Sequence, residues 1–349
     1  MNFLQYWALI EFGIVVTIVS LLFLILWRKA KENKEKARRP LPETFSGKAA
    51  YFLIYVSKII GMGLGVLLFL TLVIMFERSI ILVYRETKPA PSEVQIPADL
   101  EFKVEEVTFK SEDGLKMAGW YVPAQNDATI ILLHGYGGNR TAIIWRARQL
   151  VNAGYGVLMY DERASGESEG TYRSYGWEDP LDVKGAIQYL SSRNLNDNIG
   201  IAGCSAGADI ALYSAALYPE LGAVWADGAS SVRAQDMGRP RNLFSALIIA
   251  GNYVLDWMYT VKLDIELPEP LTNRLGDIAP RPVMLVGGGT ARPHIGSEAE
   301  LFTLRYAKIA GDNAQAWIIP EATHCNGPSL RPEEYARRMI EFFDDALLH

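Results

Sequence analysis

Two stretches near the start of the chain are almost entirely apolar. Residues 3–27 contain a single charged residue, Glu11, and residues 49–76 contain a single one, Lys58. Each stretch is longer than the twenty or so residues that a helix needs to cross about 30 Å of hydrocarbon. The pattern therefore predicts two transmembrane helices, which together would form a membrane anchor within residues 1–91.

The segment between these two stretches is strongly basic. Residues 28–48 carry eight Lys and Arg against three Glu. Short loops rich in Lys and Arg remain on the cytoplasmic side of a membrane, so both termini and everything after residue 76 are expected on the extracytoplasmic side of the cell membrane. A cleaved signal peptide is not expected, because no positive charge precedes the first apolar stretch and basic residues follow it directly.

After the anchor the pattern changes to short runs that alternate in type. Residues 88–97 contain three prolines and no periodicity, which is typical of an extended connector, and a second domain is expected over 92–349. Within it, fully apolar runs alternate with helical ones, and the first two strands are separated by an Asp-Gly turn at Asp113. We expect strands at 102–109, 115–122, 129–133, 156–160, 199–202, 223–226, 283–286 and 316–319, and helices at 141–153, 180–192, 206–218, 297–310 and 332–348.

This alternation predicts an α/β fold with a mostly parallel central sheet and helices on both faces. One segment, residues 230–275, separates two predicted strands by far more than a normal crossover and contains two long apolar runs. Long insertions of this kind often form lids or substrate-binding caps, and an extra packed helical pair is the alternative.

Charge differs sharply between the two parts of the chain. Residues 1–91 carry twelve Lys and Arg against six acidic residues, whereas residues 92–349 carry 22 against 34. The acidic second domain argues against nucleic acid as a partner, and it suits a neutral or cationic, partly apolar substrate. The four His and two Cys show no ligand spacing, so neither a metal nor another cofactor is expected.

The sequence Gly203-Cys204-Ser205-Ala206-Gly207 follows an apolar strand and precedes a helix. A serine on such a sharp strand-to-helix turn is lifted off the sheet with its hydroxyl exposed, and only small neighbours permit the turn. Ser205 is therefore the candidate nucleophile. The alternative is an ordinary loop serine beside two glycines.

A nucleophilic serine needs a base and donors for the oxyanion. His324 follows the last predicted strand and lies downstream of the serine, so it is the candidate base, with His294 as the second choice. The glycine-rich segment 134–138, directly after a strand, fits a loop whose backbone N–H faces the oxyanion. We expect the N–H groups of Tyr136 and Ala206 to form the oxyanion hole.

Taken together, residues from about 100 to 348 resemble the α/β-hydrolases of the serine aminopeptidase and esterase group. The resemblance is carried by the Asp113-Gly114 turn with Gly119-Trp120-Tyr121, by the segments 134–138 and 161–168, by the Ser205 turn, by Arg281-Pro282-Val283 and by His324. Within segment 161–168 the chain departs from the family, because Ala164 stands where the family usually has glycine.

A second departure concerns the acid that orients the histidine. The family normally has an aspartate in the loop after the strand at 283–286, but residues 287–292 contain no carboxylate. The favoured replacement is Glu298, which is closer to the loop than Glu300, and Asp227 at the end of the preceding strand is the alternative. A catalytic dyad or an inactive site also remains open.

These residues predict a membrane-anchored serine hydrolase that cleaves a carboxylic ester or a related acyl bond. An amide hydrolase of the aminopeptidase type is the second possibility, and acyl transfer to a nucleophile other than water is a weaker one. A non-catalytic binding module with the same fold is favoured by the absent aspartate. Cys204 and Cys325 adjoin Ser205 and His324, and two separate thiols are expected there rather than a disulfide.

Overall fold

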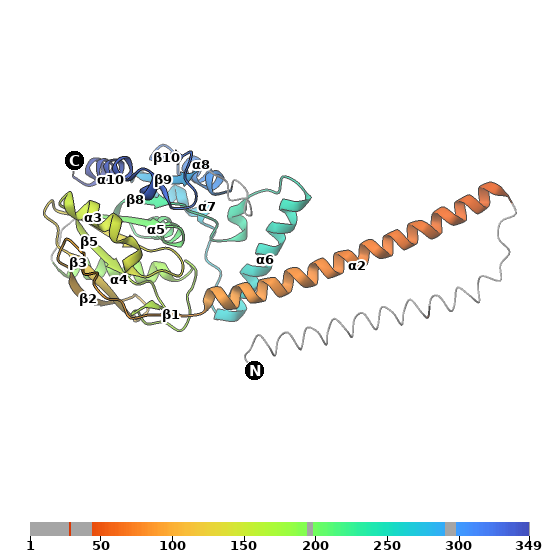
Figure 1. Cartoon of the computed structure of the whole chain (residues 1–349), viewed down its shortest axis with the longest axis horizontal. Helices are drawn as coiled ribbons and strands as arrows, with labels where there is room; N and C mark the ends of the chain where they lie inside the picture. Colours follow the sequence, from red (N-terminus) through yellow and green to blue (C-terminus); the bar gives the residue numbers. More distant parts are fainter. Residues whose placement is uncertain (1–27, 29–43, 194–197, 290–297, 349) are drawn as a thin grey trace. The chain divides into compact units, whose positions relative to one another are not determined.

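The computed structural model describes residue 28 and residues 44–193, 198–289 and 298–348. Helices and strands carry the labels of Figure 1. The chain forms two compact units, residues 1–81 and 82–349. The expected division was at 91–92, but the unit boundary lies earlier, within the last turns of a long helix.

The helix α2 spans Phe45–Thr87. Most of it belongs to the first unit, and its last residues belong to the second. Within the described residues it is the one helix long and apolar enough to cross a membrane. The stretch expected at 49–76 thus lies inside a longer helix, because the charged residues that end the apolar run, such as Glu77 and Arg78, are good helix formers. The first expected transmembrane helix, at 3–27, falls outside the described residues.

The second unit is built around an eight-stranded sheet with the order β10-β9-β8-β7-β4-β5-β3-β2. The β2–β3 and β3–β5 pairs are antiparallel, and the other neighbouring pairs are parallel. The expected mostly parallel sheet and its initial hairpin are therefore present. The strands are β2 (Glu105–Lys110), β3 (Lys116–Val122), β4 (Ala128–Leu133), β5 (Gly156–Tyr160), β7 (Asn198–Cys204), β8 (Leu221–Asp227), β9 (Val283–Gly288) and β10 (Ala314–Ile319).

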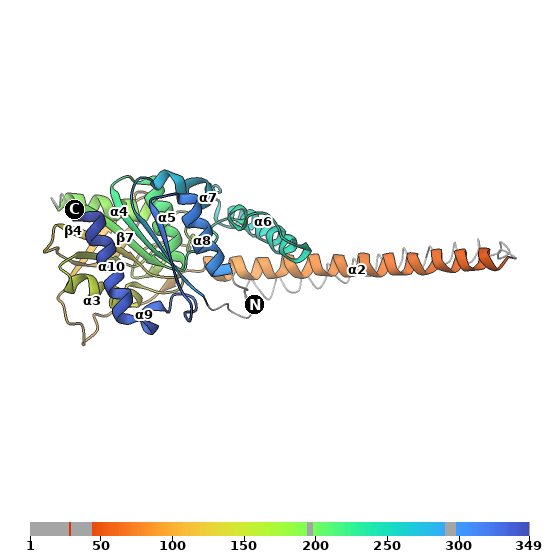
Figure 2. The same ribbon diagram turned by 90° about the horizontal axis from the view of Figure 1, so that it is seen from above.

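Helices cover both faces of the sheet (Figures 1 and 2). Side chains alternate along each strand, so Ile130 and Leu132 of β4 join a core with α3 and α10, while Ile131 faces the opposite side. Trp225 and Phe343 are fully buried in that core. The helices α3 (Ile144–Asn152) and α10 (Pro332–Leu347) lie on one face, and α4 (Asp179–Ser192), α5 (Ala206–Leu217) and α8 (Glu298–Ala310) lie on the other.

The remaining elements are short or belong to the insertion at 230–275. Two-residue strands β1 (Ala90–Pro91) and β6 (Ser165–Gly166) pair with each other. The insertion contains the 3-10 helix η2 (Ala234–Met237), the long helix α6 (Leu243–Leu263) and α7 (Leu271–Arg274). The short helices η1 (Arg140–Ile143), η3 (Leu275–Ile278) and α9 (Gly327–Leu330) lie outside it, apart from the shared residue 275.

Candidate active site

Ser205 stands on the turn between β7 and α5, as the sequence predicts. Its backbone has φ 58° and ψ −122°, a conformation that non-glycine residues rarely adopt. The N–H of Ser205 donates to the main-chain oxygen of Asp227 at 2.8 Å, which ties the turn to the end of β8. Strained backbone of this kind persists only where the surroundings hold it, and it is concentrated at functional sites.

The two glycines of the motif have no room for a side chain. A Cβ at Gly203 would lie 2.0 Å from the main-chain oxygen of Gly207, and a Cβ at Gly207 would lie 2.5 Å from that of His134. The turn therefore requires glycine on both sides of the serine. At Gly203 the start of α5 leaves no room for a Cβ, and at Gly207 the backbone of Leu133 and His134 leaves none.

The structure brings His324 to Ser205. The Nε2 atom of His324 lies 2.7 Å from Oγ of Ser205, a normal hydrogen-bond distance between a base and the hydroxyl that it would deprotonate. His324 follows β10, and its ring packs against Gly228, where an added Cβ would lie 2.9 Å from the ring. Two residues separated by 119 positions along the chain are thus within hydrogen-bond distance of each other.

Segment 134–138 lies against the turn. A Cβ at Gly135 would lie 3.4 Å from the Cβ of Ser205. In the part of the chain that the structure describes, the main-chain N–H groups of Tyr136 and Ala206 make no hydrogen bond. A small cavity is lined by both residues. Main-chain N–H groups without a partner are the donors that an oxyanion hole uses.

His134 holds this segment in place as a neutral side chain. Burial lowers its pKa, and the hydrogen bonds define one tautomer: Nδ1 donates to the main-chain oxygen of Gly135 at 2.9 Å, and Nε2 accepts from the N–H of Glu162 at 3.1 Å. Burial also raises the pKa of Glu162 well above its ordinary value. Because Nε2 accepts a hydrogen bond, the imidazole of His134 is neutral, and its 3.7 Å approach to the carboxyl group of Glu162 is not a salt bridge.

Asp227, the alternative acid, has other partners. Its carboxylate accepts hydrogen bonds from Nη2 of Arg146 at 2.6 Å and from the hydroxyl of Tyr335 at 2.9 Å. Burial opposes the charge of Arg146, but its interactions with Tyr335 and Asp227 hold its pKa well above the ordinary value. Trp225 donates to the Tyr335 hydroxyl at 2.9 Å and completes a buried network. This network braces the β8 end that binds the Ser205 N–H.

Glu298, the favoured acid, is the first residue of α8. The position of its side chain lies outside the described structure, as does that of Glu300. The second-choice base, His294, falls outside the described residues as well. The assignment of the acid therefore stays a prediction from the sequence.

Cys204 and Cys325 are free thiols, as expected. A hydrogen bond with Cys325 lowers the pKa of Cys204. The Sγ of Cys325 also lies 3.4 Å from the main-chain oxygen of Asp227, and Cys325 has a left-handed backbone with φ 58°. The two thiols thus border the nucleophile and the base without being bridged.

Two buried polar residues near the site, Arg146 and Asp209, were not identified from the sequence. Arg146 lies on a helix that the sequence identified only by its apolar spacing, and its pairing with Asp227 joins positions 81 apart. Asp209 on α5 accepts from both the N–H and the hydroxyl of Ser230, at 2.7 and 2.8 Å. A buried charged residue on an otherwise apolar helix face was the available signal in both cases.

Comparisons with known proteins bear on the fold and on the class of enzyme. Residues 124–278 match the family described as serine aminopeptidase, S33. The uncharacterized protein YfhR of Salmonella typhimurium is 29% identical over 70% of this chain and 83% of its own. The esterase Pf2001 of Pyrococcus furiosus is similar in structure, with a TM-score of 0.59 and 25% identity over 75% of this chain and 98% of the esterase.

A second solved structure, the α/β hydrolase GrgF of Penicillium sp. sh18, shares the fold with a TM-score of 0.56. It is 18% identical over 71% of this chain and 100% of GrgF. The chain therefore has the α/β-hydrolase fold. The family match and the esterase likeness further support a hydrolase of this fold.

Proposed function

We propose that the chain is a membrane-anchored serine hydrolase that cleaves a carboxylic ester through an acyl-enzyme on Ser205. The observation that carries the proposal is the 2.7 Å contact between Oγ of Ser205 and Nε2 of His324 on a strained strand-to-helix turn. The likeness to the Pyrococcus furiosus esterase favours an ester over other acyl bonds.

In the acylation step, His324 accepts the hydroxyl proton while Oγ of Ser205 forms a bond to the carbonyl carbon. The negative charge that develops on the carbonyl oxygen is stabilised by the N–H groups of Tyr136 and Ala206. As the tetrahedral intermediate collapses, the bond to the leaving oxygen breaks and His324 returns its proton to that oxygen. The alcohol leaves, and the acyl group remains on Ser205.

Deacylation repeats these roles with water. His324 accepts a proton from water as its oxygen attacks the acyl carbon, and it then protonates Oγ of Ser205 as the acid product leaves. In both steps the imidazole becomes positively charged. Glu298 would orient the ring and stabilise that charge from the first turn of α8.

The activity is tested with the full chain in detergent, using p-nitrophenyl esters of increasing acyl length. We expect ester hydrolysis by the wild type and a loss of at least about a thousand-fold in kcat for Ser205→Ala and for His324→Ala. The variant Cys204→Ser tests whether the neighbouring thiol, rather than Ser205, is the nucleophile. Turnover that persists in Ser205→Ala but is lost in Cys204→Ser would contradict the proposal.

An amide hydrolase is the second candidate, and the match of residues 124–278 to the serine aminopeptidase family favours it. Aminoacyl p-nitroanilides distinguish the two. If kcat/KM for these amides is higher than for every ester, the amide hydrolase becomes the preferred candidate. A well-folded wild type without turnover of either class, and without labelling by a serine-directed probe, would instead favour a binding module of the same fold.

Membrane anchoring is supported by the long apolar helix α2 and by the apolar composition of residues 3–27. We propose two transmembrane helices with the basic loop 28–48 in the cytoplasm and the hydrolase domain outside. A cysteine introduced by Lys36→Cys should react with a membrane-impermeant maleimide only after the cells are permeabilised, with wild type as the control for Cys204 and Cys325. Labelling of intact cells carrying Lys36→Cys above the wild-type level would show that the loop 28–48 is outside, which contradicts the proposed orientation.

A further inference from the structure

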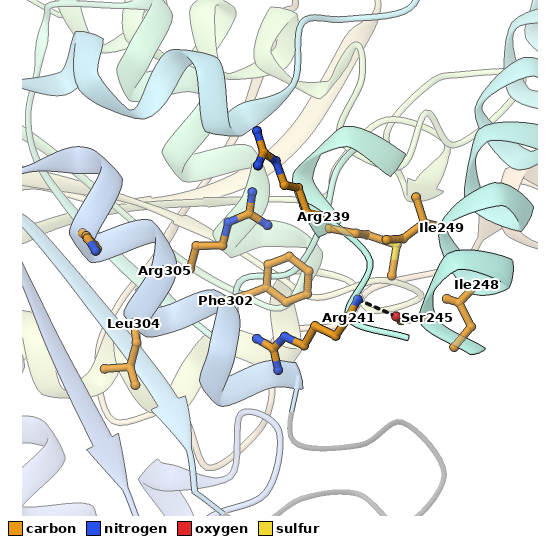
Figure 3. A pocket seen from close by; sticks show the side chains of 10 residues that line it. Arg239, Arg241, Ser245, Ile248, Ile249, Phe302, Leu304 and Arg305 are labelled. Carbon is orange, nitrogen blue, oxygen red and sulfur yellow. Dashed lines mark hydrogen bonds between the residues drawn. The ribbon is translucent and has the colours of Figure 1, made fainter. Parts of the chain in front are cut away.

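A cavity of about 400 Å³ lies between α8, the first half of α6 and the segment that joins η2 to α6. Figure 3 shows the side chains that line it. Neither Ser205 nor His324 lines this cavity, and no residue of segment 134–138 does. Among the described residues, the cavity is therefore distinct from the contact between Ser205 and His324.

Four cationic side chains surround the cavity: Arg239, Arg241, Arg305 and Lys308. Among the residues that the structure describes, none of the four is in an ion pair. Arg305 donates to the main-chain oxygen of Asp236, but that residue's carboxylate is already bound by Arg233 and Thr272.

The cluster of four cations lies in a domain whose net charge is negative. Residues 92–349 carry 22 Lys and Arg against 34 acidic residues, so cations gathered without carboxylate partners are unusual in it. Like charges repel one another, and a concave site with one sign of charge concentrates ligands of the opposite sign. The electrostatics of the cavity therefore select an anion, whereas the average charge of the domain does not.

The wall of the same cavity is apolar. Phe302 and the two isoleucines Ile248 and Ile249 line it, as does Leu304 of α8, which is 48% exposed. In the view of Figure 3, the ring of Phe302 lies between the guanidinium groups of Arg305 and Arg241. An inorganic anion would leave these side chains uncovered, so a ligand with an apolar part gains more from the site.

We propose that this cavity binds a single-chain amphiphile with an anionic head, either a carboxylate or a phosphate monoester. The head contacts Arg239 and Arg305, whose planar guanidinium groups suit both kinds of oxyanion. Arg241, on the other side of the Phe302 ring in Figure 3, adds to the positive charge of the site. The apolar chain packs against Phe302 and the isoleucines of α6. The site lies between the α6 insertion and α8, so an occupant would contact both elements at once.

The proposal is tested by isothermal titration calorimetry on the full-length Ser205→Ala protein in detergent, which separates binding from turnover. The probes are octanoate, octyl phosphate and octan-1-ol, each corrected for a titration into detergent alone. We expect one site for at least one of the two anions and an affinity at least ten-fold weaker for the alcohol. Tighter binding of octanoate or of octyl phosphate identifies the preferred head group.

Two sets of variants locate the site. Arg239→Gln combined with Arg241→Gln changes two exposed side chains and should weaken anion binding at least ten-fold without changing the melting temperature. Phe302→Ala should weaken the octyl anions more than acetate or inorganic phosphate. Arg337→Gln, a cation paired with Glu341 on α10, is the control and should bind as the parent does.

Three results would overturn the proposal: equal binding of octan-1-ol, unchanged anion binding in the double arginine variant, or recruitment by vesicles containing anionic phospholipid without binding of either monomeric anion. The last result would indicate a membrane-docking surface in place of a ligand site. Each of these outcomes is independent of whether Ser205 is a nucleophile.

Discussion

The carboxylate of Asp227 accepts a hydrogen bond from Arg146 at 2.6 Å, while the main-chain oxygen of the same residue binds the N–H of Ser205 at 2.8 Å. Asp227 thus supports the nucleophile turn through its backbone and a buried ion pair through its side chain. This arrangement favours Glu298 over Asp227 as the acid that acts on His324.

Replacing each candidate acid by its amide should therefore have different effects: one substitution should lower stability and the other should lower kcat. Asp227→Asn leaves Arg146 buried without its anionic partner, so we expect a loss of about 3–5 kcal/mol in the free energy of unfolding. Glu298→Gln should preserve the melting temperature and lower kcat by up to about 10⁴-fold, as expected when the group that orients the base is neutralised. Thermal unfolding and ester kinetics on both variants check this. If Asp227→Asn is stable and loses more kcat than Glu298→Gln, Asp227 is the catalytic acid and Glu298 is not.

Gly207→Ala tests the close packing of the nucleophile turn. The added Cβ would lie 2.5 Å from the main-chain oxygen of His134 and 2.8 Å from that of Leu133. Because both contacts are with backbone, we expect a loss of about 1–3 kcal/mol in stability together with reduced kcat. Gly276→Ala, where nothing lies within 4 Å of the new Cβ, is the matched control and should leave both unchanged. Equal effects of the two substitutions would argue against the close packing described here.

Ala164→Gly should stabilise the protein. Ala164 has φ 56°, a left-handed conformation that is costly for alanine and free for glycine. After the entropy that glycine loses on folding is subtracted, we expect a gain of about 0.5–1 kcal/mol. Ala147→Gly, in the buried interior of α3, should have the opposite sign. A destabilised Ala164→Gly would show that the methyl group contributes more through packing than it costs in strain.

The pH dependence of stability should contain a contribution from Asp209. Burial raises its pKa from 3.8 to about 7. The folded state therefore binds a proton that the unfolded state has released between these two values, and this contribution to stability is complete below pH 3.8 and lost as the pH rises to about 7. Asp209→Asn should raise the melting temperature by several degrees at pH 8, with the difference shrinking towards pH 4.

Melting temperatures measured from pH 4 to pH 8 check this dependence, with Asp312→Asn as the exposed control. The control should follow the wild type throughout. A difference between Asp209→Asn and wild type that stays constant across this range would contradict protonation of Asp209 in the folded state.

The sequence was sufficient for the features that depend on local patterns. Apolar strands, the hairpin at Asp113 and the Ser205 turn have periodic or glycine signals, and each is present in the structure. The two-residue strands β1 and β6 have no such signal, because two residues cannot show a period. Likewise, α2 runs past residue 76 because charged residues end an apolar run without ending a helix.

Part of the site could not have been predicted from sequence because it depends on tertiary contacts. Strand order suggested that Ser205 and His324 would meet, since the carboxyl ends of parallel strands share one edge of the sheet. The pairing of Asp227 with Arg146 instead depends on how α3 packs on the sheet, which no local pattern encodes. The same holds for the cationic cavity, whose residues come from three separate segments.

The central claim is that Ser205 is a nucleophile activated by His324, and a fluorophosphonate probe tests it most directly. Intact-mass and peptide analysis of the full-length protein should show a single adduct on Ser205 that is absent in Ser205→Ala and forms far more slowly in His324→Ala. An adduct on another residue, or no adduct on well-folded wild type, would contradict the account.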